Sequence, residues 1–158
     1  LLCAGLDFGY SVDPSTFIRL YKWNNAYIFD ELLYRKGMLN RDISHFLKDK
    51  QILENIYADS AEPKSISEIR SYGHKIFPVT KGRDSVIYGI NLINQNEIYI
   101  TSTSNNLIRE LQGYVWDKDK EGNNIQKPTG IHPDCIDAAR YALMMQLENP
   151  NRGKYAIR

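Results

Sequence analysis

Three aspartates occupy positions at which the sequence can build a metal site. Asp7 and Asp59 each end a run of apolar residues, as side chains do at the carboxyl ends of buried strands. Asp137 lies in a later segment that has the apolar spacing of a helix. Carboxylates that gather at one point repel one another unless cations lie between them, and Mg²⁺ and Mn²⁺ prefer oxygen ligands of this kind. The three acids therefore predict a site that holds two Mg²⁺ or Mn²⁺ ions and hydrolyses phosphodiester bonds, with water as the nucleophile.

Each acid also has an ordinary structural explanation. Asp7 fits a turn at a strand end, Asp59 fits the cap of a following helix, and Asp137 fits a solvated helix face. We favour metal binding, because an unpaired charge after an apolar run is costly. Asp7 would then bridge both ions, while Asp59 and Asp137 complete their ligand shells. Asp134 fits equally well as the first residue of a helix or as an auxiliary ligand.

The composition is that of a single globular domain. The chain has 158 residues, of which 42% are hydrophobic and 25% are charged. Its formal charge of +1 argues against tight, nonspecific nucleic-acid binding by this domain alone, because neutralised phosphates supply most of such affinity. The apolar runs are too short for a membrane span, so we expect no membrane partner. Cys3 and Cys135 have no metal-ligand spacing and fit buried thiols. The chain begins with Leu1 rather than Met, so we expect it to be part of a longer protein.

The pattern of strands and helices predicts an α/β fold with a mixed central sheet flanked by helices. Strands are expected at 1–8, 17–21, 26–33, 52–58, 76–79 and 97–101, the first three as an antiparallel meander. Helices are expected at 40–48 with Asn40 as the cap, and at 63–71, 84–94, 105–112 and 133–147. A β-hairpin with a charged tip is expected at 114–127. The domain would cover residues 1–150, and 151–158 would be a tail or linker.

Four motifs in this chain resemble the nuclease domain of bacteriophage terminase large subunits. They are the segments 6–10, 58–64, 79–86 and 134–141, and the similarity runs in order over about residues 3–147. The resemblance implies a ribonuclease H-like fold and metal-dependent cleavage of concatemeric double-stranded DNA during genome packaging. The setting it implies is the cytoplasm of an infected bacterial host.

The resemblance also indicates which residues and partners to expect. Its matched acids are Asp7, Asp59 and Asp137. Many relatives have a histidine three residues before the last acid, where this chain has Asp134, and His132 is offset from that position. The implied partners are a packaging ATPase domain of the same polypeptide, the portal and the small terminase subunit. The ATPase domain is absent here, since the chain contains no G-x-x-x-x-G-K-[ST] motif.

Basic residues near the acids are candidates for DNA contact. Lys64 lies in the second motif, and Lys81 and Arg83 in the third precede a predicted helix. The alternative is that they simply face water. We expect Arg140 to pair with a neighbouring acid, and the predicted hairpin to limit access of duplex DNA to the site.

Other functions remain open from the residues alone. A junction resolvase or a transposase would use the same chemistry on the same fold. An actin-like ATPase fragment would also begin with three antiparallel strands and an early aspartate, but it would need glycine-rich phosphate loops that are missing here. A packaging module without catalytic activity is a further alternative.

Overall fold

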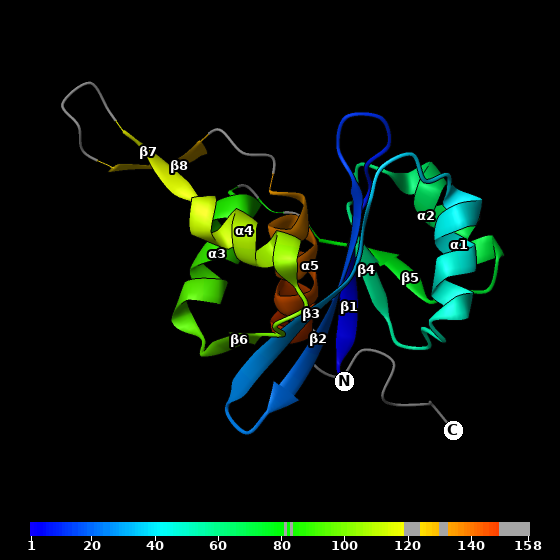
Figure 1. Ribbon diagram of the computed structural model, residues 1–158, viewed down its shortest axis with the longest axis horizontal. Coiled ribbons are helices and arrows are strands. Elements are labelled where there is room, and N and C mark those ends of the chain that lie inside the picture. Colours follow the sequence, from blue (N-terminus) through cyan, green and yellow to red (C-terminus); the bar gives the residue numbers. More distant parts are fainter. Residues whose placement is uncertain (81, 83, 119–123, 130–132, 149–158) are drawn as a thin grey trace.

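A six-stranded mixed sheet forms the centre of the molecule, in a computed structural model that describes residues 1–80, 82, 84–118, 124–129 and 133–148. The strand order is β5-β4-β1-β2-β3-β6. The strands are β1 (Cys3–Asp7), β2 (Ser15–Trp23), β3 (Ala26–Arg35), β4 (Ile56–Ala58), β5 (Ile76–Pro78) and β6 (Ile98–Ile100). The helices are α1 (Asn40–Asp49), α2 (Pro63–Ser71), α3 (Ser85–Gln95), α4 (Asn105–Gly113) and α5 (Asp134–Glu148). The predicted α/β sheet flanked by helices is confirmed (Figure 1).

The first three strands form the predicted antiparallel meander. The turn between β2 and β3 is Asn24-Asn25, and Asn24 adopts a left-handed backbone with φ of 53°. The other strands join the meander in parallel: β4 lies beside β1, β5 beside β4, and β6 beside β3. Leu6 is paired with Ala58. Asp7 and Asp59 follow these two residues, so both acids lie at the carboxyl ends of their strands and on the same side of the molecule, as the sequence predicts.

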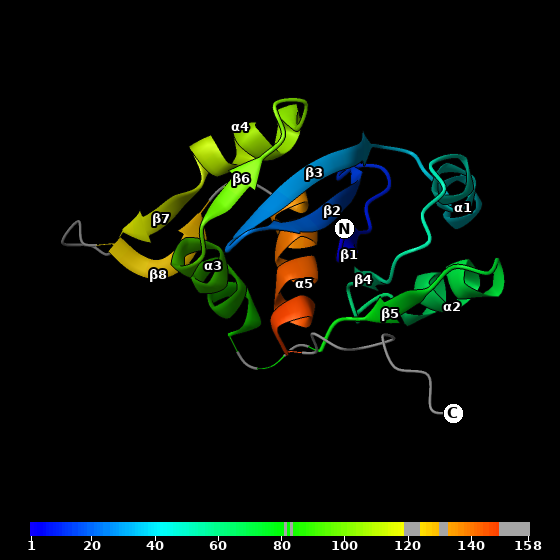
Figure 2. The same cartoon turned by 90° about the horizontal axis from the view of Figure 1, so that it is seen from below.

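Two apolar cores lie on opposite faces of the sheet because side chains alternate along each strand. On β1, Cys3 joins the core formed with α3, α4 and α5, whereas Ala4 and Leu6 join the core formed with α1 and α2. Figure 2 shows α5 against β1, β2 and β3, and α1 and α2 grouped near β4 and β5. The sheet is therefore covered on both faces, and α5 is the helix that crosses the strands carrying the site.

Some predicted boundaries are corrected by the structure. The fourth strand was expected from residue 52 but covers only Ile56–Ala58. The chain first leaves α1 through Gln51, which has a φ of 51°, and the Ile52 N–H still donates to the Leu47 carbonyl. Asn40 is the first residue of α1 and not its cap. Leu39 takes the cap position, and its N–H donates to Asp42 Oδ2 at 2.9 Å.

The expected hairpin is present as β7 (Val115–Lys118) and β8 (Asn124–Thr129), which pair antiparallel. It lies at the end of the molecule that also carries α3 and α4 (Figures 1 and 2). Its tip at 119–123 and the predicted tail at 151–158 lie outside the described residues. Among the helices that are described, none has the length and apolar character needed to cross a membrane.

Close packing between α5 and β1 depends on a glycine. A Cβ atom on Gly5 would lie 1.8 Å from the Ala138 carbonyl oxygen and 3.2 Å from the Ala142 nitrogen. These contacts are to backbone atoms, which cannot rotate away as a side chain can. Any larger residue at position 5 would therefore push the helix away from the strand.

We predict that Gly5→Ala lowers the free energy of unfolding by about 3 kcal/mol, because the added methyl group forces backbone atoms apart. Urea unfolding followed by circular dichroism measures the change. The matched control is Gly82→Ala, where a Cβ meets no atom within 4 Å, and its effect should stay below about 1 kcal/mol. Equal stability of Gly5→Ala and wild type would contradict this account of the packing.

Candidate metal centre

Four carboxylates approach one another at the carboxyl ends of the neighbouring strands β1 and β4. Asp7 is the last residue of β1, and Asp59 directly follows β4. Asp134 and Asp137 lie in the first turn of α5, which packs across β1. Three elements that are distant in sequence therefore bring the predicted acids together.

The other three acids act on Asp7 electrostatically. The pKa of Asp7 is raised from its ordinary value of 3.8 to about 8, first by burial and then by the negative charges of Asp137, Asp134 and Asp59, in that order of effect. Arg140 acts in the opposite direction but does not compensate. Asp7 is thus the centre of an excess of negative charge. A divalent cation bound there would relieve that excess.

Two residues of α5 hold two of the acids. The Arg140 Nε–H donates to Asp137 Oδ1 at 2.7 Å, and this arginine is only 2% exposed. Its guanidinium carbon lies 4.6 Å from the centroid of the Tyr141 ring. The Tyr141 hydroxyl donates in turn to Asp59 Oδ2 at 3.3 Å. The expected pairing of Arg140 with a neighbouring acid is therefore confirmed.

The donor set fits a hard divalent cation, because all four side chains offer carboxylate oxygens and because their charges are not balanced. As the side chains lie, the described residues contain no group of three or more His, Cys, Asp or Glu close enough to hold an ion. The Arg140 contact occupies one oxygen of Asp137. Residues that would hold an ion are Asp7, Asp59 and Asp137, with Asp134 beside them, and this assignment stays a prediction.

The predicted phosphate contacts are only partly described. Lys64 is exposed in the first turn of α2, close in sequence to Asp59. Lys81 and Arg83 lie outside the described residues. Cys135, by contrast, fits the prediction of a buried thiol: it is 0% exposed, and burial together with the Glu110 carboxylate raises the pKa of that thiol.

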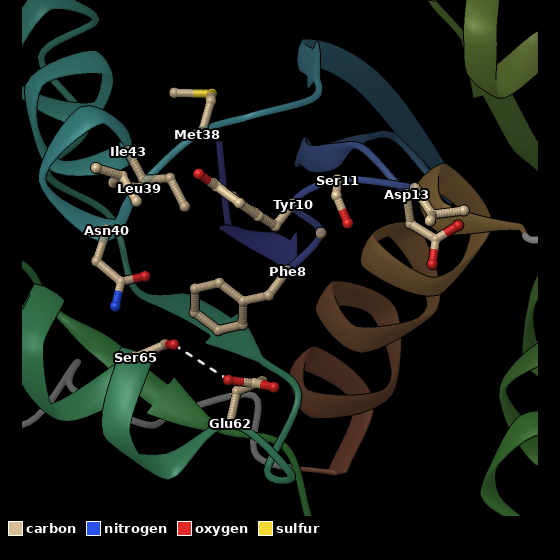
Figure 3. Close-up of a pocket in the computed structure, with 12 residues that line it drawn as sticks. Phe8, Tyr10, Ser11, Asp13, Met38, Leu39, Asn40, Ile43, Glu62 and Ser65 are labelled. Atoms are coloured by element: carbon tan, nitrogen blue, oxygen red, sulfur yellow. Dashed lines mark hydrogen bonds between the residues drawn. The ribbon is translucent and has the colours of Figure 1, made fainter.

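A pocket of about 500 Å³ lies beside the loop that follows Asp7, and no pattern in the sequence predicts it. Phe8 and Tyr10 follow Asp7 and line it together with residues at the start of α1 (Figure 3). On the α2 side, the Ser65 hydroxyl donates to Glu62 Oε2 at 3.1 Å. The pocket therefore opens between the loop after β1 and the first turns of two helices.

Glu110 on α4 is a second feature that the sequence analysis missed. It is only 7% exposed, and Glu110 Oε2 accepts a hydrogen bond from the Ile136 N–H in the first turn of α5 at 3.0 Å. Burial raises its pKa to about 7 despite this hydrogen bond. The signal in the sequence was a glutamate three residues after Leu107, on the helix face that faces the core.

The sheet order, the parallel pairing of β1 with β4 and the acids at their ends define a ribonuclease H-like α/β fold of the nuclease class. The chain belongs to the family of terminase RNase H-like domains, whose model matches residues 7–145. This membership agrees with the resemblance seen in the four motifs. It favours a terminase domain over a junction resolvase, a transposase or an actin-like ATPase fragment.

Two curated relatives are terminase large subunits. The protein of Bacillus phage SPP1 is 34% identical over 145 residues, which cover 87% of this chain and 34% of that protein. The PBSX phage terminase large subunit of Bacillus subtilis strain 168 is 29% identical over 143 residues, covering 88% of this chain and 33% of that protein. The chain thus spans about a third of the length of the curated relatives it matches.

Solved structures of large terminase nuclease domains also match this chain. The crystal structure of the SPP1 large terminase nuclease domain with bound Mn matches with a TM-score of 0.80 and 32% identity, covering 91% of this chain and 85% of that chain. The nuclease domain of the P22 large terminase matches with a TM-score of 0.68 and 14% identity, covering 92% and 80%. The second likeness concerns the fold alone.

We predict that the metal-free protein becomes less stable as the pH rises from about 4 to about 8. The carboxyl group of Asp7 loses its proton near pH 3.8 in an unfolded chain but near pH 8 in the folded one. Between these values the folded state holds a proton that the unfolded state has lost, so stability falls with rising pH by up to about 1.4 kcal/mol per unit. Glu110 adds a fall of the same sign up to about pH 7.

Asp7→Asn should therefore raise the melting temperature in EDTA at pH 8 and leave a shallower dependence on pH. Asp49→Asn is the matched control, because Asp49 is exposed at the end of α1. Thermal unfolding between pH 5 and pH 8 measures both effects. A large loss of stability in Asp7→Asn at pH 8 would mean that the carboxylate has a structural role.

Proposed function

We propose that this chain is the metal-dependent endonuclease domain of a viral DNA-packaging terminase, which cuts concatemeric double-stranded DNA. The observation that carries the proposal is the convergence of Asp59, Asp134 and Asp137 on the half-buried Asp7. The SPP1 nuclease domain, 32% identical, was crystallised with bound Mn. That relative supports the use of Mn²⁺ or Mg²⁺ here, with two ions as the expected number.

Asp7, Asp59 and Asp137 would hold the ions, and Asp134 would add charge beside them. When bound, such ions activate water and stabilise the charge that develops on the phosphate. Asp7 supplies the central carboxylate, because the charges of Asp137, Asp134 and Asp59 all act on it. Arg140 fixes one oxygen of Asp137 and leaves the other for a ligand bond. Tyr141 orients Asp59 through its hydroxyl.

The substrate and the partners follow from the family and from the charge of the chain. A net charge of +1 supplies little attraction for DNA, so we infer that other parts of a longer protein, including a packaging ATPase domain, supply most of the grip. Lys64, Lys81 and Arg83 would contact phosphates near the cut. The portal and the small terminase subunit are the proposed partners, in the cytoplasm of an infected bacterium.

We predict that the chain nicks and linearises supercoiled plasmid in the presence of Mn²⁺ and that EDTA abolishes this activity. Single substitutions Asp7→Asn, Asp59→Asn and Asp137→Asn should each lower the rate by more than about 100-fold, because loss of a ligand should exceed the effect typical of residues behind the ligands. Gel electrophoresis of the plasmid measures the rate, and Asp49→Asn should cleave like wild type.

Two results would count against the proposal. Equal nicking with and without EDTA would exclude the metal mechanism. A pure wild-type chain that does not cleave in Mn²⁺ would instead favour a packaging module without catalytic activity.

A further inference from the structure

We propose that Glu110 is a positioning residue that sets the place of Asp134 and Asp137 by capping α5 from a neighbouring helix. This inference rests on the proposed function, because the acids that it positions are the expected metal ligands. Glu110 belongs to α4 and is separated in sequence from α5 by the hairpin. Its carboxylate is nevertheless directed at the first turn of α5.

Among the described residues, the position directly before α5 offers no side-chain acceptor to the first N–H groups of the helix. The first N–H groups of a helix have no partner within the helix, and a Ser, Thr, Asn or Asp at the cap usually accepts one of them. The residue before α5 is Pro133, whose side chain carries no acceptor. Its carbonyl accepts the Asp137 N–H at 2.7 Å, which leaves the earlier N–H groups in need of a partner.

Glu110 supplies the missing acceptor. Its Oε2 accepts the Ile136 N–H at 3.0 Å, and hydrogen bonds from the Ile136 and Cys135 backbone both act to lower its pKa. Because Glu110 is 7% exposed, little water is present to replace it. Its removal would leave buried N–H groups unsatisfied, and the first turn of α5 would shift to find water.

A second contact fixes the same turn from the central sheet. The Thr16 hydroxyl on β2 donates to the Asp134 carbonyl at 2.8 Å, and both residues are buried. α4 and β2 therefore hold the segment that carries Asp134 and Asp137. Small displacements of ligands have large effects on metal binding and rate, so this turn must be placed accurately.

α4 is itself anchored by the same kind of contact. Glu31 on β3 accepts the Asn106 and Leu107 N–H groups at 3.0 and 2.8 Å in the first turn of α4. A carboxylate of β3 thus fixes α4, and a carboxylate of α4 fixes α5. The position of the acids on α5 therefore depends, through α4, on the central sheet.

The test compares Glu110→Ala, Glu110→Gln and Glu54→Ala. The glutamine keeps an acceptor oxygen for the Ile136 N–H but removes the charge. Glu54 is the matched control: its side chain is 6% exposed, and it pairs with Arg19 at 2.6 Å near the start of β4, the strand whose other end precedes Asp59. Isothermal titration with Mn²⁺ gives the metal affinity, and plasmid cleavage gives kcat and KM.

We expect Glu110→Ala to weaken Mn²⁺ binding and to lower kcat by about 10-fold or more, as is typical when the support of a metal ligand is lost. KM for DNA should stay unchanged, because Glu110 is buried and touches no substrate. Glu110→Gln should retain most of the affinity, and Glu54→Ala should lose stability without losing affinity. Unchanged Mn²⁺ affinity in a folded Glu110→Ala protein would overturn the inference. Equal losses in Glu110→Gln and Glu110→Ala would also overturn it, because charge would then be the cause.

Failure of the proposed function has a separate signature. If wild type neither binds Mn²⁺ nor cleaves DNA, the proposed function is wrong, and amide hydrogen exchange then decides the positioning role. The Cys135 and Ile136 amides should exchange faster in Glu110→Ala than in Glu54→Ala. Equal exchange in the two variants would refute the role of Glu110.

Discussion

The close contact between α5 and β1 is the constraint on which the rest of the structure depends. The helix presents Ala138 and Ala142 to the strand, and the strand presents Gly5, so that backbone lies almost directly on backbone. This approach is possible only with small residues at the contact. Asp137 precedes the contact on the helix, and Asp7 follows it on the strand. The same packing that buries the core therefore also brings together the acids of the candidate metal centre.

Like charges repel one another, so bringing the acids together costs free energy. The guanidinium of Arg140 offsets part of this repulsion. Arg140 is almost completely buried, and burial of an arginine is tolerated only when an acid pairs with it. Burial and the negative charges of Asp137, Asp134 and Asp59 outweigh the effect of Arg140, so the pKa of Asp7 is still about 8. A fold that was selected only for stability would have no reason to retain this excess. The remaining imbalance is best explained by a function that supplies further positive charge.

The sequence predicted the fold well where local patterns are strong, and it predicted the candidate site where acids follow apolar runs. The meander, the mixed central sheet and the limits of α2 at Pro63–Ser71 all agree with expectation. The predicted start of β4 at residue 52 was wrong. Ile52 is buried because it packs where the chain leaves α1, and it does not belong to a strand. Its apolar character alone cannot distinguish these two situations. The roles of Glu110 and Tyr141 were missed for a related reason. Each depends on a partner from a distant element, and no spacing in the sequence marks such a contact.

The capping of α5 by a distant glutamate also bears on the two roles considered for Asp134. If the cap were local, an aspartate near the start of the helix would be the natural acceptor, and its carboxylate would be turned toward the backbone. Glu110 takes that function from another helix, so the Asp134 carboxylate is not required for it. Asp134 instead lies at the first position of α5, is 8% exposed, and adds its charge to the field at Asp7. On this proposal, two different acids perform the two tasks: Glu110 fixes the start of the helix, and Asp134 adds negative charge beside Asp7.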